Sequence, residues 1–205
     1  MTVIVDYGVG NLFSLKSSLD YIGESCLVSG DAEEISRADR IILPGVGAFG
    51  DAAKKLSAGR LDRLLSDQAK SGKPFMGICL GMQLLFDAGY EFGKSQGLGI
   101  ISGEVKSIEP IIPAGYKIPH IGWNRLIFSK RGKSSPVFKY ISEGDYVYFV
   151  HSFAALDCED SLIASAEYGG MLTAAVQSEN IFGMQFHPEK SGEVGLKILK
   201  AFCEL

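Results

Sequence analysis

Histidine is scarce in this chain, and cysteine is not much more frequent. Only three histidines occur among 205 residues, so chemistry that needs an imidazole must use His120, His151 or His187. The four cysteines form no C-x-x-C pair, although zinc sites and the disulfide frameworks of small secreted domains usually depend on such spacing. We therefore expect no metal, no disulfide framework and no cofactor.

Long apolar runs and an excess of basic charge are also missing. No stretch approaches the roughly 20 apolar residues that cross a bilayer, and residues 1–6 lack the basic segment that opens a secretory signal. The net charge of -4 gives no electrostatic attraction to nucleic acid or an anionic membrane. These absences predict a cytoplasmic protein without nucleic-acid or membrane partners.

The residues that are present predict one globular domain. Hydrophobic residues make up 46% of the chain and charged residues 21%, which is typical of a soluble protein with a packed core. No linker, repeat or low-complexity tract divides the chain. We therefore expect residues 1–205 to form a single domain.

Short apolar runs alternate with amphipathic stretches in the first half of the chain. This alternation predicts βαβ units and a mostly parallel sheet covered by helices on both faces. The expected strands are residues 3–5, 26–28, 41–43 and 74–79, and the expected helices are residues 12–22, 61–69 and 82–86.

The second half of the chain has a different pattern, with strand following strand. It predicts an antiparallel β extension to the α/β fold and a final helix over residues 191–205. The basic segment 129–135 is interpreted as a solvated loop. The expected strands are residues 105–108, 126–128, 146–150, 162–167, 172–176 and 181–186.

Cys79 lies between Gly77 and Gly81, directly after an apolar run. A glycine-flanked turn between a strand and a helix holds its central side chain in a strained, exposed position. A helix N-terminus at this point would also favour the thiolate over the thiol. The pattern predicts that Cys79 is a nucleophile, although an isolated cysteine is more often a packing residue.

His187 is the predicted base for this nucleophile. It follows an expected strand, and Glu189 lies two residues further on, which places both on one face of an extended chain. A carboxylate in that position can hold the imidazole in the useful tautomer. His151 also ends an expected strand but has no carboxylate behind it, and His120 is assigned no chemistry in an irregular region.

The backbone N–H of Leu80 is the first candidate donor for an oxyanion, because it follows the nucleophile. The glycine-rich loop 44–50 is the expected source of a second donor, around Val46 and Gly47. That loop has the glycine spacing of a phosphate-binding P-loop, but Asp51 stands where the lysine belongs. Gly8-Val9-Gly10 also lacks the third glycine of a dinucleotide site, so neither nucleotide motif is supported.

Two segments together resemble the class I, or triad, glutamine amidotransferases: Gly77-Ile78-Cys79-Leu80-Gly81-Met82-Gln83 and Gln185-Phe186-His187-Pro188-Glu189. Further segments extend the resemblance nearly end to end and narrow it to the glutaminase subunits of imidazole glycerol phosphate synthase. They are residues 6–12, 44–47, 121–124, 148–152 and 187–191.

The resemblance implies hydrolysis of glutamine to glutamate and ammonia, and delivery of the ammonia to a separate cyclase subunit. That partner would be a (βα)8 barrel of histidine biosynthesis, joined to this chain as a heterodimer. Cys79 would be the nucleophile, His187 the general base and acid, and Glu189 its orienter. Gly47, Gln83, His151, Ser152 and Phe153 would bind glutamine, while Asn11, Trp123 and Lys190 would face the cyclase.

Three alternatives remain at this point. The chain could be a triad glutaminase that serves a different synthase, although the segments around Val46 and Trp123 weigh against it. It could also be a non-catalytic regulatory subunit that keeps the fold, which the intact set of Cys79, His187 and Glu189 makes improbable. A cysteine peptidase or related hydrolase is disfavoured by Gln83 and by the carboxylate after His187.

Overall fold

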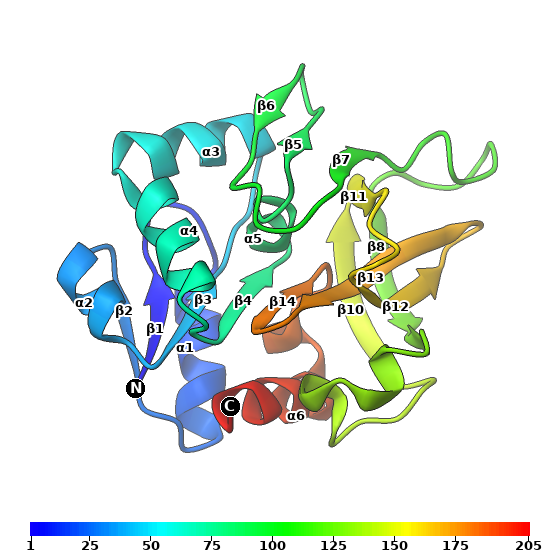
Figure 1. Ribbon diagram of the computed structural model, residues 1–205. Coiled ribbons are helices and arrows are strands. Elements are labelled where there is room, and N and C mark those ends of the chain that lie inside the picture. Colours follow the sequence, from blue (N-terminus) through cyan, green and yellow to red (C-terminus); the bar gives the residue numbers. More distant parts are fainter.

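The computed structural model describes all residues, 1–205, and its centre is a sheet of eight strands (Figure 1). The strand order is β2-β1-β3-β4-β14-β13-β12-β9. The bounds are β1 Thr2–Val5, β2 Cys26–Ser29, β3 Arg40–Leu43, β4 Phe75–Ile78, β9 Ile127–Phe128, β12 Leu162–Glu167, β13 Met171–Ser178 and β14 Ile181–Met184.

This sheet is parallel on one side and antiparallel on the other. Strands β2, β1, β3, β4 and β14 pair in parallel, whereas β13, β12 and β9 continue from β14 in antiparallel pairs. The predicted α/β fold with an antiparallel extension is confirmed. Strand β14 belongs to the parallel part, because it pairs with β4 although about 100 residues separate them in the chain.

Helices cover both faces of the sheet, as predicted. The alternation of side chains along a strand sends Val3 and Val5 into one core, with helices α2, α3 and α4, and Ile4 into the other, with α1 and α6. Figure 1 shows these two groups of helices on opposite sides of the strands. The bounds are α1 Leu12–Tyr21, α2 Ala32–Arg37, α3 Phe49–Ala58, α4 Leu61–Lys70, α5 Leu80–Gln83 and α6 Gly192–Cys203.

Two smaller sheets lie outside the central one. A ribbon joins β8 (His120–Arg125) to β10 (Tyr146–His151), and a four-stranded sheet has the order β11-β7-β5-β6. The expected strands at residues 105–108 and 146–150 therefore exist but do not extend the central sheet. The bounds are β5 Ala88–Gly89, β6 Ser95–Gln96, β7 Glu104–Ser107 and β11 Phe153–Leu156.

Three local predictions need correction. His120 does not lie in an irregular region, because it begins β8 and pairs with His151. The helix after the cysteine is α5, a single turn that starts at Leu80 rather than a helix over residues 82–86. The basic segment 129–135 is not simply a solvated loop, since it contains a 3-10 turn at Gly132–Ser134 in which Gly132 is buried against the backbone of Ile163.

The two cores lie on opposite faces of one sheet, and the single domain stays a prediction. No helix is both long enough and apolar enough to cross a bilayer.

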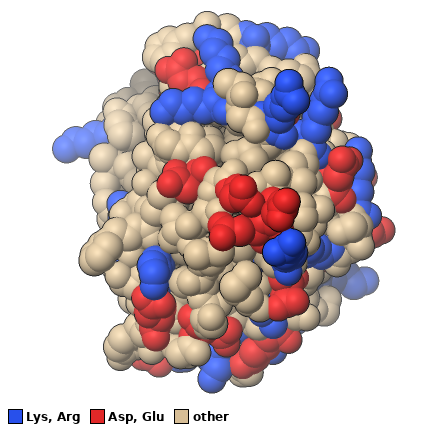
Figure 2. Space-filling view, turned by 90° about the vertical axis from the view of Figure 1, so that its left-hand side faces the viewer, with Lys and Arg blue, Asp and Glu red and all other residues tan.

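On the face shown in Figure 2, acidic and basic side chains both occur, and no continuous field of basic side chains covers it. The cytoplasmic location stays a prediction.

Candidate active site

Cys79 occupies a strained turn between β4 and α5. Its backbone has φ 55° and ψ -113°, a region that non-glycine residues rarely adopt, and its N–H donates to the carbonyl of Met184 on the neighbouring strand at 2.7 Å. A Cβ at Gly77 would lie 2.6 Å from the carbonyl oxygen of Gly81, and one at Gly81 would lie 1.8 Å from that of Leu43. Both positions therefore require glycine, as the sequence indicated.

Two details of this turn differ from expectation. Cys79 is only 8% exposed, so its sulfur is reached through a pocket and does not stand on an open surface. Helix α5 is a single turn, and the small macrodipole of so short a helix gives a thiolate little help. The stabilising partners of the sulfur must therefore come from side chains.

His187 and Glu189 form a buried pair beside this turn. His187 Nδ1 lies 2.8 Å from Glu189 Oε1, and each side chain is about 3% exposed. The predicted contact is present, but the expected reason was wrong. Residues Pro188–Lys190 form a 3-10 turn rather than an extended chain, and that turn carries Glu189 back toward the imidazole.

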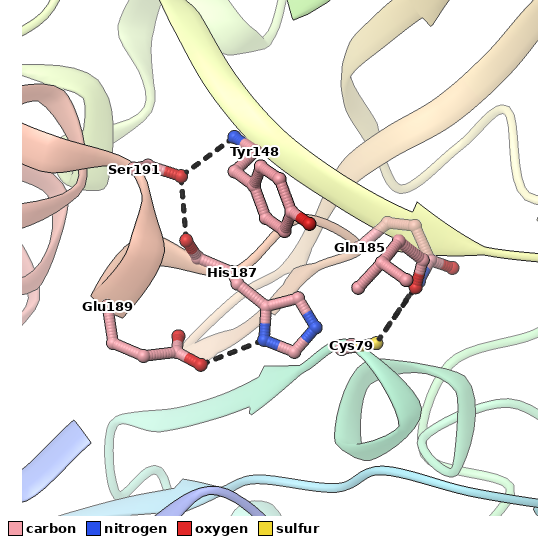
Figure 3. Close-up of polar contacts among 7 residues, drawn as sticks. Cys79, Tyr148, Gln185, His187, Glu189 and Ser191 are labelled. Carbon is pink, nitrogen blue, oxygen red and sulfur yellow. Dashed lines mark hydrogen bonds and ion pairs between the residues drawn. The ribbon is translucent and has the colours of Figure 1, made fainter. Parts of the chain in front are cut away.

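The ring of His187 lies between its carboxylate and the cysteine, with Nε2 directed toward Cys79 (Figure 3). Burial alone would lower the pKa of His187, but hydrogen bonds to Cys79 and Glu189 and their negative charges outweigh it and raise the pKa to about 9. The raised pKa means that the imidazole of His187 is protonated at neutral pH. The arrangement can accept and return a proton at the sulfur.

The backbone of His187 is held by β10. Its N–H donates to the carbonyl oxygen of Tyr148 at 2.9 Å. The hydroxyl of Ser191 donates to the carbonyl oxygen of His187 at 2.6 Å and accepts from the N–H of Tyr148 at 2.9 Å (Figure 3). These bonds fix the position from which the imidazole reaches Cys79.

Cys79 and His187 open into one pocket of about 360 Å³. Every residue expected for the oxyanion or for glutamine binding lines it. These residues are Val46, Gly47, Leu80, Gln83, His151, Ser152 and Phe153, and Glu91, Pro119, Val150 and Lys190 complete the lining.

The expected oxyanion donors lie at the edge of this pocket. Leu80 is the first residue of α5, so its N–H has no acceptor within the helix. A Cβ at Gly45 would lie 2.9 Å from the N–H nitrogen of Gly81, which shows how closely the loop after β3 approaches α5. Tyr7 supports that loop by donating from its hydroxyl to the carbonyl oxygen of Pro44 at 2.9 Å.

His151, the competing base, is unsuited to that role. Its Nδ1 lies 2.8 Å from the carbonyl oxygen of Phe153, which can only accept, and its Nε2 lies 3.0 Å from Nδ1 of His120. Both ring nitrogens are thus occupied. Burial lowers the pKa of His151 to about 4, so this ring stays neutral and holds backbone in place. His120, which was assigned no chemistry, is its hydrogen-bond donor.

Sequence reasoning did not identify Glu91 or Gln185. Glu91 follows β5, accepts the N–H of Phe49 at 2.8 Å and places its carboxylate in the pocket wall. Gln185 is wholly buried, and its Nε2 lies 3.8 Å from the sulfur of Cys79. Nothing in the sequence around Glu91 marks it, whereas Gln185 stands two residues before His187 and could have been found from that position.

Of the three residues expected to face a partner, one lines the pocket and two lie outside its lining. Lys190 lines it and also places Nζ 6.0 Å from the ring centroid of Tyr148. Trp123 packs edge-on against the same tyrosine and is 52% exposed. Asn11 precedes α1, outside the pocket lining. An exposed aromatic and basic surface thus lies next to the pocket.

No group of three or more His, Cys, Asp or Glu side chains in the structure is arranged to hold a metal ion. The four cysteines are all free, and Cys158 and Cys203 are buried outside the lining of the pocket that holds Cys79. The reactive groups that the structure brings together at the site are the sulfur of Cys79, the imidazole of His187 and the carboxylate of Glu189.

Comparisons with known proteins agree with this geometry. The family model described as glutamine amidotransferase class-I matches residues 3–204. The chain is 48% identical to the imidazole glycerol phosphate synthase subunit HisH of Lactococcus lactis, over 98% of this chain and 97% of the relative. It is 45% identical to the subunit of the same name from Aquifex aeolicus, over 98% and 95% of the two chains.

Solved structures show the same fold at much lower identity. PurLQS from Thermotoga maritima superimposes with a TM-score of 0.76 at 21% identity, covering 99% of this chain and 97% of that one. A further glutamine amidotransferase structure gives a TM-score of 0.75 at 16% identity, covering 98% and 97%. The chain belongs to the class I glutamine amidotransferases and, among them, to the HisH subunits of imidazole glycerol phosphate synthase.

Proposed function

We propose that Cys79 carries the glutaminase reaction of this synthase subunit, which acts in histidine biosynthesis. The sulfur of Cys79 attacks the side-chain carboxamide carbon of glutamine and forms a C–S bond. The tetrahedral oxyanion collapses, the C–N bond breaks, and ammonia leaves with a proton from His187. Water then attacks the thioester, His187 takes a proton from that water, and glutamate leaves as the sulfur is released.

The observation that carries this proposal is the buried pair of His187 and Glu189 facing Cys79. The 2.8 Å contact between His187 Nδ1 and Glu189 Oε1 leaves Nε2 free to exchange the proton with the sulfur and with the leaving nitrogen. Glu189 fixes the tautomer and stabilises the imidazolium. The raised pKa of His187, about 9, places a proton on the ring before the sulfur attacks, and this is the proton that the leaving nitrogen takes.

The lining of the pocket supports the binding roles. The N–H of Leu80 and an N–H from the loop at Val46 and Gly47 would hold the oxyanion. Glu91 offers a carboxylate to the α-ammonium group of glutamine. Gln83 and the backbone at His151, Ser152 and Phe153 would hold the rest of its amino-acid end, because all four residues line the same pocket.

A partner is needed to use the ammonia. Ammonia that escapes into water is protonated and diffuses away, and the eight strands of the central sheet and the helices on both of its faces belong to the glutaminase fold. We propose that the partner is the cyclase subunit of the synthase, a (βα)8 barrel, in a heterodimer. Asn11, Trp123 and Lys190 would face it, and the exposure of Trp123 supports that position.

The test replaces the nucleophile in the assembled synthase. Cys79→Ala should abolish synthesis that depends on glutamine, by at least about a thousandfold, while synthesis from added ammonium salt stays at the wild-type rate. Both rates are followed by formation of the imidazole product. A Cys79→Ala complex that still uses glutamine would contradict the proposed role, and so would an intact wild-type complex that uses only ammonia.

A further inference from the structure

Gln185 is a buried side chain beside the nucleophile that the reaction described above does not use. It lies between the end of β14 and His187, is 0% exposed, and its N–H donates to the carbonyl oxygen of Ala174 at 2.9 Å. A buried carboxamide is costly unless its polar atoms find partners. Its Nε2 has the sulfur of Cys79 within 3.8 Å, a distance typical of hydrogen bonds to sulfur.

The neighbours of Gln185 fix which end of its amide faces the sulfur. Gln83 Nε2 lies 3.1 Å from the carbonyl oxygen of Phe153, so the NH2 group of Gln83 must be on that side. The same nitrogen lies 3.0 Å from Gln185 Oε1. Since Gln83 donates both of its hydrogens, Gln185 has to present its oxygen to Gln83 and its NH2 group to Cys79.

This orientation is held from further away as well. The carbonyl oxygen of Phe153 accepts a second hydrogen bond, from Nδ1 of His151 at 2.8 Å, and His151 is held in that tautomer by His120 at 3.0 Å. A continuous chain of hydrogen bonds therefore runs from His120 through His151, Phe153, Gln83 and Gln185 to the sulfur. A donor held in this way cannot turn away from its acceptor without breaking several bonds.

We infer that Gln185 is a catalytic residue whose carboxamide donates a hydrogen bond to the Cys79 thiolate and stabilises it opposite His187. The inference rests on the proposed function, in which Cys79 is the nucleophile. A hydrogen bond to the charged form of a group favours that form, and a donor fixed in advance needs no rearrangement during the reaction. The contact increases the fraction of thiolate before attack and stabilises the sulfur when the thioester is hydrolysed.

The test measures alkylation of Cys79 by iodoacetamide against pH in the assembled synthase, with the Cys79 peptide quantified by mass spectrometry. Besides Gln185, the groups that face Cys79 include the titratable side chains of His187, Tyr7, His151, Glu91 and Lys190, which all remain in the variant. Gln185→Met keeps the bulk and removes the donor. We expect the midpoint of the alkylation curve to rise by about one pH unit, a tenfold loss of thiolate at lower pH.

The glutaminase rate provides a second readout. Gln185→Met should lower kcat about tenfold at pH 7 with a smaller change in KM, because the lost contact is to the sulfur and not to glutamine. Gln177→Met is the matched control. Gln177 lies on β13, outside the pocket, and accepts from the hydroxyl of Ser135 at 2.6 Å, so its loss should leave the alkylation midpoint unchanged.

An unchanged alkylation midpoint in folded Gln185→Met would overturn the inference, and a lower melting temperature with that unchanged midpoint would assign Gln185 to packing alone. If Gln185→Met does not fold, Gln185→Leu provides the same measurement. Wild-type complex that does not hydrolyse glutamine would instead remove the proposed function. The two failures are therefore distinguishable.

Discussion

His187 differs in charge from the other two histidines at neutral pH because its ring nitrogens have different partners. His187 faces a carboxylate and a thiol group, which raise its pKa to about 9 against the opposing effect of burial. His151 is buried between another imidazole and a carbonyl oxygen, and its pKa falls to about 4. Burial also lowers the pKa of His120. One ring is suited to proton transfer, and the other two are suited to holding the pocket.

These shifts predict how the free energy of unfolding depends on pH. His151 has a folded pKa below the usual 6.5, so its contribution is complete above pH 6.5 and is lost as the pH falls toward 4. His187 has a folded pKa above 6.5, so its contribution is complete below pH 6.5 and is lost as the pH rises through 9. Urea denaturation measures how far the free energy of unfolding falls at acid pH. We expect this fall to be smaller in His151→Gln than in wild type, by on the order of 3 kcal/mol at most.

His187→Gln is the control for this measurement. It should reduce the fall in the free energy of unfolding at alkaline pH and leave most of the fall at acid pH in place. If the free energy of unfolding falls by the same amount at acid pH in wild type and in His151→Gln, His151 is not held neutral in the folded protein.

At the scale of single residues, sequence motifs were enough to propose the triad but not its surroundings. Cys79 and His187 stand in patterns that have a chemical reason, whereas Glu91 and the pairing of His120 with His151 arise only when strands meet in space. Glu189 was proposed from its spacing, yet the 3-10 turn that brings it to His187 was not expected. Proline at position 188 fits both an extended chain and the first position of such a turn.

At the scale of the element, the turn from β4 into α5 depends on close backbone approach. The Cβ that Gly81 lacks would collide with the carbonyl oxygen of Leu43 at 1.8 Å, and the one that Gly77 lacks would meet the N–H nitrogen of Met82 at 2.7 Å. Together these glycines allow α5 to lie directly against the end of β3. That contact sets the distance between the N–H of Leu80 and the loop at Val46 and Gly47.

Gly81→Ala should therefore move α5 away from β3. We expect a loss of about 1–3 kcal/mol in the free energy of unfolding from overpacking, and a fall in glutaminase rate of about a hundredfold from displacement of the sulfur and the oxyanion donor. Chemical denaturation and glutamine turnover in the assembled synthase measure the two effects.

Gly59→Ala is the matched control for that substitution. Gly59 ends α3 with φ -80°, and a Cβ there would make only ordinary contacts at 3.5 Å. Its expected change is within about 0.5 kcal/mol, with the glutaminase rate unchanged. Equal effects of the two substitutions would show that the approach of α5 to β3 is not what requires glycine at position 81.

The elements with strong apolar patterns were predictable, and the short ones were not. Strands β1, β3 and β4 are buried along most of their length and appear in the sequence as continuous apolar runs. Strands β5 and β6 have two residues each, which is too short for any periodicity. Strand β8 alternates exposed residues with residues that are buried or half-buried, but it includes Gly122 and follows Pro119, which made it resemble a loop.

At the scale of the whole molecule, the site exists because β4 and β14 are neighbours. Their parallel register pairs Ile78 with Met184, so the turn that carries Cys79 and the segment that carries His187 leave the sheet at the same edge. Ligand sites of parallel sheets lie at the carboxyl ends of the strands, and the sequence placed Cys79 and His187 directly after an apolar run and an expected strand. It did not predict which strands are adjacent, because pairing across about 100 residues leaves no local signal.

The central claim is that this fold places a single reactive sulfur in a pocket shaped for glutamine. The most direct measurement is covalent labelling of the assembled synthase with a glutamine analogue that bears an electrophile, followed by peptide mass spectrometry. We predict one adduct per chain, on Cys79, with labelling prevented by excess glutamine and absent in Cys79→Ala. Labelling of Cys26, Cys158 or Cys203 in its place, or no labelling of an enzyme that is hydrolysing glutamine, would contradict the account.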